Sequence, residues 1–330
     1  MNNASPERVR PRVNAPTSKA SFTAAFEQHR RELHVHCYRM LGSFSDAQDL
    51  VQETFLRAWQ SRDRFEGRAS FRAWLYRIAT NACLDALQHS SRRKTVLAGS
   101  PADVLVESVS FGPYPDALLD QVAARPDGVV IERETIELTF LAVMQHLPPR
   151  QRAVLIIRDV LGWTAAETAE LLDVSVASAN SLLQRARSTL QQHRPARRSE
   201  WRRPSVTDAE NDLLSRYMQA HERADANAII ALLGDSARIT MPPEQPYIGA
   251  ARSAEFFLEI LGPAGPGEWR LVPTRANRQP AAANYLRRPG DTEFRALSID
   301  VLRIEDGRLV EVNCFLGDHR FAEFGLPLVM

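Results

Sequence analysis

The sequence contains almost no lysine and carries almost no net charge. Of its 41 basic residues only Lys19 and Lys94 are lysines, and 40 acidic residues bring the formal net charge to +1. This balance excludes a polycation, so any contact with nucleic acid must come from local patches. The bias toward arginine reflects a GC-rich genome more than a function.

Cysteine is also scarce, and long hydrophobic runs are absent. Cys37, Cys83 and Cys314 are far apart in the chain, which excludes a disulfide framework and a zinc-binding spacing and favours a reducing cytoplasm. No apolar run reaches the ~18 residues of a membrane helix, and the N-terminus has no apolar signal core. We therefore expect a cytoplasmic protein with no membrane contact. We also expect no cofactor and no metal, because no carboxylate or cysteine cluster completes the histidines near residue 30.

The length of 330 residues predicts two or three domains. Changes in composition along the chain predict six segments. They give a disordered tail (1–20), a helical segment (21–95), an acidic proline-containing linker (96–133), a second helical segment (134–192), a basic tether (193–206) and a C-terminal domain (207–330).

The stretch from Trp163 to Leu190 has the pattern of a helix-turn-helix. Thr164 and Glu167 form a capping box for one helix, and Ser175 can cap a second helix from Val176 to about Gln191. The outer face of that second helix carries side chains that can contact bases or phosphates: Ser178, Asn180, Ser181, Gln184, Arg185 and Arg187. An ordinary helical hairpin with a solvated polar face is the alternative.

Three amphipathic helices are predicted near the N-terminus. The first extends from about Phe22 to Leu41, the second begins with a capping box at Ser45, and the third runs from Phe71 to about Gln88. Aromatic and basic residues around the third helix suit single-stranded nucleic acid, whose bases stack on aromatic rings. Trp74 fits a core position equally well.

The linker contains six acids and one short amphipathic segment, PDALLDQVA, and plain tethering is its simplest role. A further helix is expected from about Ile131 to His146. Pro148 and Pro149 then interrupt the chain before an apolar segment.

The segments DAQDLVQETFLRAWQ, FRAWLYRIATNACLDALQ and LPPRQRAVLIIRDVLGWTAAETAELLDVS resemble the sigma-70 family, and more narrowly the extracytoplasmic-function (ECF) sigma factors. The resemblance covers roughly residues 22–95 (region two) and 134–192 (region four). It implies two all-α domains, no catalysis, and binding to promoter DNA and to the β′ clamp and β flap of core RNA polymerase. In this family the linker threads toward the polymerase active-site channel, where its acids imitate nucleic-acid phosphates.

The resemblance also implies roles for matching positions. The residues implied to dock on the β′ clamp are Asp46, Asp49, Gln52, Glu53 and Phe55. Those implied to melt and bind the −10 element are Phe65, Trp74, Arg77, Asn81, Asp85, Arg92 and Arg93. Those implied to bind the −35 element are Ser175, Ser178, Asn180, Ser181, Gln184, Arg185 and Arg187. The family often has basic residues where this chain has Asn180 and Leu183.

After Pro204 the order helix, helix, strand, helix and several antiparallel strands predicts an α+β domain. IDVLRIEDGRLVEVNCF resembles the closing hairpin of the cone-shaped SnoaL-like (NTF2-like) superfamily, whose pocket acids serve catalysis in some members. The candidates here are Tyr217, Asp300, Asn313 and His319. We favour a non-catalytic interpretation, in which Asp300 and Asn313 alternate outward on their strands.

These patterns predict a sigma factor whose C-terminal domain contacts region two, region four or the linker and biases an open–closed equilibrium. An unidentified small molecule could also be a partner. Two alternatives stay open, a ligand-sensing repressor and a bifunctional protein with an isomerase-like or cyclase-like domain. A repressor has no need of the segment that resembles region two.

Overall fold

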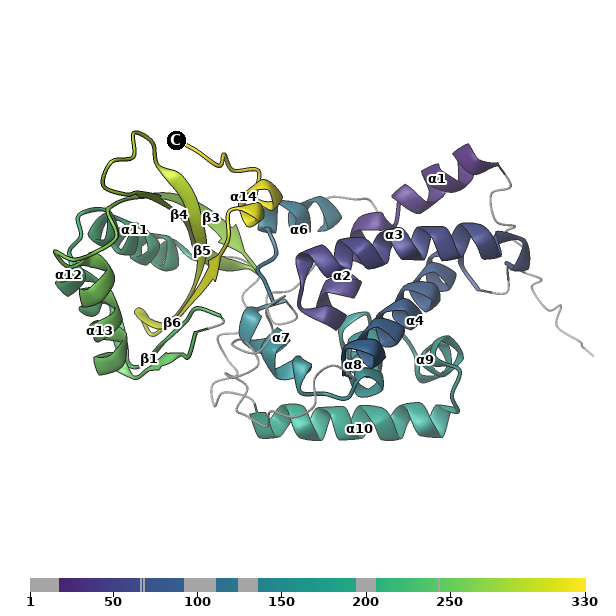
Figure 1. Ribbon diagram of the computed structural model, residues 1–330. Helices are drawn as coiled ribbons and strands as arrows, with labels where there is room; N and C mark the ends of the chain where they lie inside the picture. The colour runs from purple at the N-terminus through teal and green to yellow at the C-terminus, as the bar shows by residue number, and fades with distance from the viewer. Residues whose placement is uncertain are drawn as a thin grey trace, which may run out of the picture.

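The computed structural model describes residues 18–65, 67, 69–91, 111–123, 136–193, 206–242 and 244–330. Figure 1 shows two lobes, a helical one and a smaller one in which helices cover a strongly curved sheet. Arg92 and Arg93 lie outside the described residues.

Four helices and a 3₁₀ turn form the N-terminal part of the helical lobe. They are α1 (Lys19–Glu27), α2 (Arg30–Leu41), α3 (Phe44–Ser61), η1 (Arg62–Arg64) and α4 (Phe71–Ser91). The single helix predicted for residues 22–41 was wrong, because the chain bends at Gln28 and His29. The bend accompanies the packing of Phe22 and Phe26 edge-on against Phe55 of α3.

The start of α3 also differs from the prediction. Ser43, not Ser45, precedes the helix, and its hydroxyl accepts the Asp46 N–H at 3.2 Å. Phe44 is thereby inside the helix, where its ring packs against His34 and Tyr114 at centroid distances of 4.6 and 5.2 Å. Packing between distant segments therefore set this helix boundary.

The rest of the helical lobe consists of one linker helix and the region that follows it. The elements are α6 (Asp116–Ala123), α7 (Leu138–Gln145), α8 (Pro149–Leu155), the π-helical turn η3 (Ile156–Val160), α9 (Ala165–Leu172) and α10 (Val176–His193). Helix α7 begins at Leu138, and the predicted start near Ile131 lies outside the described residues. The Ile136 carbonyl and the Leu138 N–H bond to side chains of the other lobe, so they are not available to an earlier helical turn.

The predicted helix-turn-helix is confirmed in its local detail. Thr164 and Glu167 form the capping box at the start of α9, and the Ser175 hydroxyl accepts the Ser178 N–H at 3.1 Å at the start of α10. Asp173 ends α9 in the left-handed region at φ 53°, a conformation that Asp tolerates better than most residues.

The C-terminal lobe has the predicted α+β fold. Its helices are α11 (Asp208–Glu222), α12 (Ala226–Ile230), α13 (Ala250–Leu261) and α14 (His319–Glu323). Its strands are β1 (Leu233–Thr240), β2 (Tyr247–Ile248), β3 (Glu268–Ala276), β4 (Gln279–Arg287), β5 (Arg295–Glu305) and β6 (Arg308–Leu316). The sheet order is β2-β1-β6-β5-β4-β3, and of these neighbours β1 and β6 run parallel while the other pairs are antiparallel.

The two faces of this sheet belong to different cores. Ala282 and Leu302 pack with α11, α12 and α13 inside the cone. Alternate residues such as Ala283 and Val301 face the other way and join the hydrophobic core of the helical lobe. Because side chains alternate along a strand, the sheet is buried on both sides, and the helical lobe and the linker cover its outer face.

Candidate nucleic-acid interface

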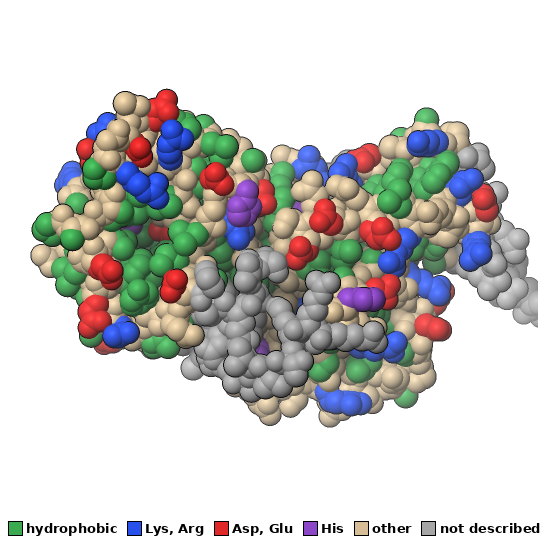
Figure 2. Space-filling view, viewed as in Figure 1, with side chains coloured by type: hydrophobic (Ala, Val, Ile, Leu, Met, Phe, Trp, Pro, Cys, Tyr) green, Lys and Arg blue, Asp and Glu red, His purple; other side chains and the backbone are tan. Residues whose placement is uncertain are grey.

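Helix α3 carries the residues expected to bind polymerase on its outward face. Asp46, Asp49 and Gln52 are exposed, and Glu53 accepts from Arg57 at 2.8 Å. An adjoining groove of about 370 Å³ is lined by Thr23, Phe26, Glu27, Arg30, Val51, Gln52, Phe55 and Leu56. Figure 2 shows hydrophobic side chains gathered over α1 and α3. Of the predicted contact residues, Gln52 and Phe55 thus line this largely apolar groove.

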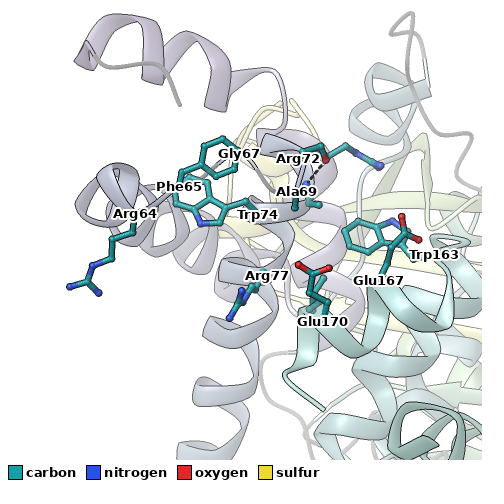
Figure 3. Close-up of a pocket in the computed structure, with 13 residues that line it drawn as sticks. Arg64, Phe65, Gly67, Ala69, Arg72, Trp74, Arg77, Trp163, Glu167 and Glu170 are labelled. Atoms are coloured by element: carbon teal, nitrogen blue, oxygen red, sulfur yellow. Dashed lines mark hydrogen bonds between the residues drawn. The ribbon is translucent and has the colours of Figure 1, made fainter. Parts of the chain in front are cut away.

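The residues expected to bind the −10 element line a larger groove between α4 and α9. The ring of Phe65 packs at a tilt against the ring of Trp74, at a centroid distance of 5.1 Å, and Arg77 lies one helical turn further along α4. The groove encloses about 660 Å³, and Figure 3 shows both of its walls. Its lining residues are Arg64, Phe65, Gly67, Ala69, Ser70, Arg72, Ala73, Trp74, Arg77, Trp163, Glu167, Glu170 and Leu171.

Two other residues expected at the −10 element lie further along α4. Asn81 is exposed, and Asp85 accepts from Arg57 Nη1 at 2.9 Å. Because Arg57 also donates to Glu53, it joins the surface expected to bind polymerase to the helix expected to bind DNA. These pairs are solvent-exposed and contribute little to stability.

The residues expected to bind the −35 element lie on the outer side of α10. Ser178, Asn180, Ser181, Gln184 and Arg185 are all exposed, whereas Ala179, Leu183 and Ala186 are buried against the rest of region four. This division leaves a polar helix face that a DNA major groove can accept.

Arg187 differs from its neighbours on α10 because its charge is already paired. Its Nη2 and Nε donate to the two carboxylate oxygens of Asp159 at 2.6 and 2.9 Å. This two-pronged bond holds α10 against the end of η3, so Arg187 supports the helix as well as being a candidate for DNA contact.

The four candidates in the C-terminal lobe do not form one site. The Tyr217 hydroxyl donates to Asp300 Oδ2 at 2.9 Å inside the cone, but His319 is exposed on α14. Asn313 bonds to Thr240 and opposes Val301, which belongs to the outer face of the sheet. The expectation that both residues point outward was wrong for Asp300, which lies inside the cone, and Asn313 on the outer face is covered; they are 2% and 1% exposed.

Burial raises the pKa of Asp300, although hydrogen bonds from Asn284, Tyr217, Cys314 and Ser298 oppose the shift. A carboxylate with this many internal partners is a structural centre of the cone. His221, on the same helix as Tyr217, is fully buried among aromatic rings, and burial lowers its pKa to about 3.

The joint between the lobes is built around Asn277, at the tip of the β3–β4 hairpin. Asn277 Nδ2 donates to the Tyr38 hydroxyl at 2.8 Å and to the Ile136 carbonyl at 2.7 Å, and its Oδ1 accepts the Tyr114 N–H at 2.7 Å. One side chain therefore bonds to region two, to the linker and to the start of region four.

Backbone geometry aims this side chain. Asn277 and Arg278 have φ values of 55° and 60°, as in the type I′ turn of a tight hairpin. The Asn277 N–H also donates to the Tyr114 carbonyl at 2.9 Å, so the linker at residues 114–115 pairs with the end of β3 like a short strand.

The linker between the lobes is held from both sides. On region two, the Tyr38 hydroxyl donates to the Gly112 carbonyl at 2.8 Å and His34 bonds to the Tyr114 hydroxyl at 2.8 Å. On the cone, Asp116 accepts the Arg278 N–H at 2.8 Å, and Asp120 pairs with the Arg278 guanidinium. Burial raises the pKa of Asp116 to about 6, against the opposing effect of Arg278.

Sequence reasoning missed Asn277, Tyr114 and Arg278. The signals were faint: two aromatic residues in a proline-rich linker (FGPYP) and a short polar turn between two strands. Partners 163 or 239 residues apart leave no local pattern.

Among the described residues no group of three or more His, Cys, Asp and Glu side chains could hold a metal ion. Within the same part of the chain, every helix is too short or too polar to cross a membrane.

Comparison with known proteins accords with this geometry. Family models match residues 25–93 (sigma-70 region 2), 137–190 (sigma-70 region 4) and 214–312 (SnoaL-like domain). The ECF RNA polymerase sigma factor SigG of Mycobacterium tuberculosis is 43% identical over 325 residues, which cover 96% of this chain and 86% of that protein. SigJ of the same organism is 29% identical over 312 residues, with coverage of 92% and 93%.

A multidomain sigma factor with a fused SnoaL-like domain is therefore the class that the fold defines. The chain belongs to the ECF RNA polymerase sigma factors. The crystal structure of M. tuberculosis SigJ shares its overall fold, with a TM-score of 0.60, 23% identity and coverage of 93% of this chain and 99% of that one.

Proposed function

We propose that this sigma factor directs core RNA polymerase to its promoters and that its SnoaL-like domain restrains it by holding the linker. The exposed face of α3, with Asp46, Asp49 and Gln52, docks on the β′ clamp, and region four meets the β flap. The α4 groove takes the −10 strand, and the outer face of α10 takes the −35 duplex. No bond chemistry occurs on the chain.

The carboxamide of Asn277 is the observation that carries the proposed restraint. It bonds at once to Tyr38, Tyr114 and Ile136, so the linker cannot leave the joint without breaking this buried set. A linker that must thread into the polymerase has to be released first. Because buried hydrogen-bond partners are costly to leave unpaired, the docked state resists that release.

The rival functions make different demands on the cone. An isomerase-like enzyme needs an acid–base group that is free to exchange a proton with a substrate. Both carboxyl oxygens of Asp300 instead accept hydrogen bonds from other side chains of the domain. A repressor needs only region four and a sensor. We therefore propose that the cone is a regulatory domain.

Transcription from a promoter library with purified core polymerase tests the proposal. We expect promoter-specific initiation that depends on the added protein and decreases when Asp49 and Gln52 are both changed to alanine. Binding to duplex DNA without any initiation would contradict the sigma mechanism and favour the repressor.

A further inference from the structure

The groove expected to bind the −10 strand has one wall from each sigma region. Region two supplies Phe65, Trp74 and Arg77, and region four supplies Trp163, Glu167 and Glu170. Figure 3 shows Arg77 on α4 and Glu170 on α9 lying across the groove from one another. The second wall places carboxylates beside a surface whose aromatic and basic groups suit a nucleic-acid strand.

Packing holds α9 against region two. The Trp163 ring lies 5.5 Å from the ring of Tyr76 on α4, and Thr168 and Leu171 on the inner side of α9 are buried. Helix α9 therefore forms a fixed wall of the groove in this closed arrangement.

The charge of Glu167 is fixed in place as well. Its Oε2 accepts from the hydroxyl and the N–H of Thr164 at 2.7 and 2.8 Å. These two hydrogen bonds lower the pKa of Glu167, so the carboxylate stays ionised at neutral pH. Glu170 is exposed one helical turn further along.

A phosphodiester strand entering this groove meets two negative charges. At physiological salt the Debye length is about 8 Å, so the repulsion between charges that meet within the groove is only partly screened. On the outer face of α10, Ser178, Asn180 and Gln184 are exposed, and no described residue of α10 on that face is acidic. In this arrangement the outer face of α10 is accessible to DNA, whereas the carboxylates of α9 lie beside the α4 groove.

We propose that α9 acts as an intramolecular substitute for nucleic acid, with Glu167 and Glu170 excluding a single strand from the α4 groove until region four moves away. The inference rests on the proposed role of that groove in −10 binding. It implies an order of recognition in which the −35 duplex is bound before the −10 strand.

The test uses the full chain and a fluorescein-labelled single-stranded DNA 12-mer of randomised sequence, followed by anisotropy. The variant E167Q/E170Q removes both charges, and the glutamine at 167 can still accept from Thr164 and keep the capping box. Glu259 on α13 is exposed and distant from the groove, so E259Q is the matched charge control. W74A measures how much of the binding uses the groove.

We expect E167Q/E170Q to bind the 12-mer about three- to tenfold more tightly at low salt, E259Q to match wild type, and W74A to remove the gain. Affinity for duplex DNA should stay within about twofold in all these proteins. If the double variant does not fold, E170Q alone lies outside the capping box and should show a smaller gain.

Two results would overturn the inference alone. One is unchanged strand affinity in E167Q/E170Q while W74A weakens binding, and the other is an equal gain in E259Q. If W74A has no effect on strand binding in the E167Q/E170Q background, the proposed −10 role of the groove fails and the inference fails with it.

Discussion

Asn277 and Tyr38 are 239 residues apart in the chain, yet the Asn277 carboxamide donates to the Tyr38 hydroxyl at 2.8 Å in a fully buried contact. The Tyr38 hydroxyl in turn donates to the carbonyl of Gly112 in the linker. The tip of the cone hairpin and the first sigma domain thus hold the linker between them, and most of the predictions below follow from this arrangement.

Replacing Asn277 with glycine should destabilise the docked state by about 2–4 kcal/mol, because three buried partners lose their hydrogen bonds. Glycine adopts the φ of 55° at this position without strain, so the loss reports the carboxamide alone. Urea unfolding followed by tryptophan fluorescence gives the change. A difference below about 0.5 kcal/mol would show that the contact is not important for docking.

Protonation of Asp116 should strengthen docking as the pH falls, whereas His34 opposes this change, because burial against Tyr114 lowers its pKa to about 4. The pKa of Asp116 is about 6 in the docked form, above its usual 3.8, so the docked form binds a proton that the undocked form releases. The contribution of Asp116 protonation to the free energy of docking is complete below about pH 4 and is lost as the pH rises through 6. Burial also raises the pKa of Glu323, to about 7, with the same sign.

Fluorescence energy transfer between the lobes, measured from pH 4.5 to 7.5, checks this dependence. D116N keeps an oxygen for the Arg278 N–H but cannot titrate, so its profile should be flatter than that of wild type. A D116N profile equal to that of wild type would contradict the assignment to Asp116.

Asp159 should tune the affinity of the −35 helix. In D159N the carboxylate charge is gone and the guanidinium of Arg187 is freed for phosphate. We expect tighter binding of duplex DNA and a slope of log K against log salt that is steeper by about 1. R187A should weaken binding instead. If D159N binds duplex DNA less tightly, the pair serves only to position α10.

The polar centre of the cone should matter for stability and not for turnover. Y217F removes the hydroxyl that donates to Asp300 at 2.9 Å and should cost about 1–3 kcal/mol, because a buried acceptor loses its donor. Thermal unfolding checks the loss, and transcription at a temperature where both proteins are folded should be unchanged. Loss of an isomerase-like or hydrolytic turnover in Y217F would support the bifunctional alternative.

Local signals in the sequence predicted local structure well. The capping box at Thr164 and Glu167 and the cap at Ser175 are bonds between residues three apart, and a window of sequence contains all that they need. Boundaries set by distant partners were predicted poorly. The bend at His29 accompanies packing against α3, and the residues just before α7 bond to side chains of the other lobe.

The candidate sites divide in the same way. Periodicity identified the exposed faces of α3 and α10, because a helical pattern fixes which residues share a face. It could not indicate that α9 forms one wall of the groove at α4 or that Arg187 is paired with Asp159. Nor could it find the two-sided burial of the sheet, since strands buried on both faces lose the alternation that marks an exposed side.

The central claim is that the cone restrains initiation by holding the linker. Its most direct test is promoter-library transcription with core polymerase and full-length N277G. A point variant is preferable to removal of the cone, because removal would expose the apolar surface that now packs on the sheet. N227G on the exposed turn of α12 is the control for a glycine substitution away from the joint. We predict a several-fold higher output for N277G than for wild type or N227G at equal protein concentration. Output equal to wild type, in a protein whose docking is measurably weakened, would contradict the account.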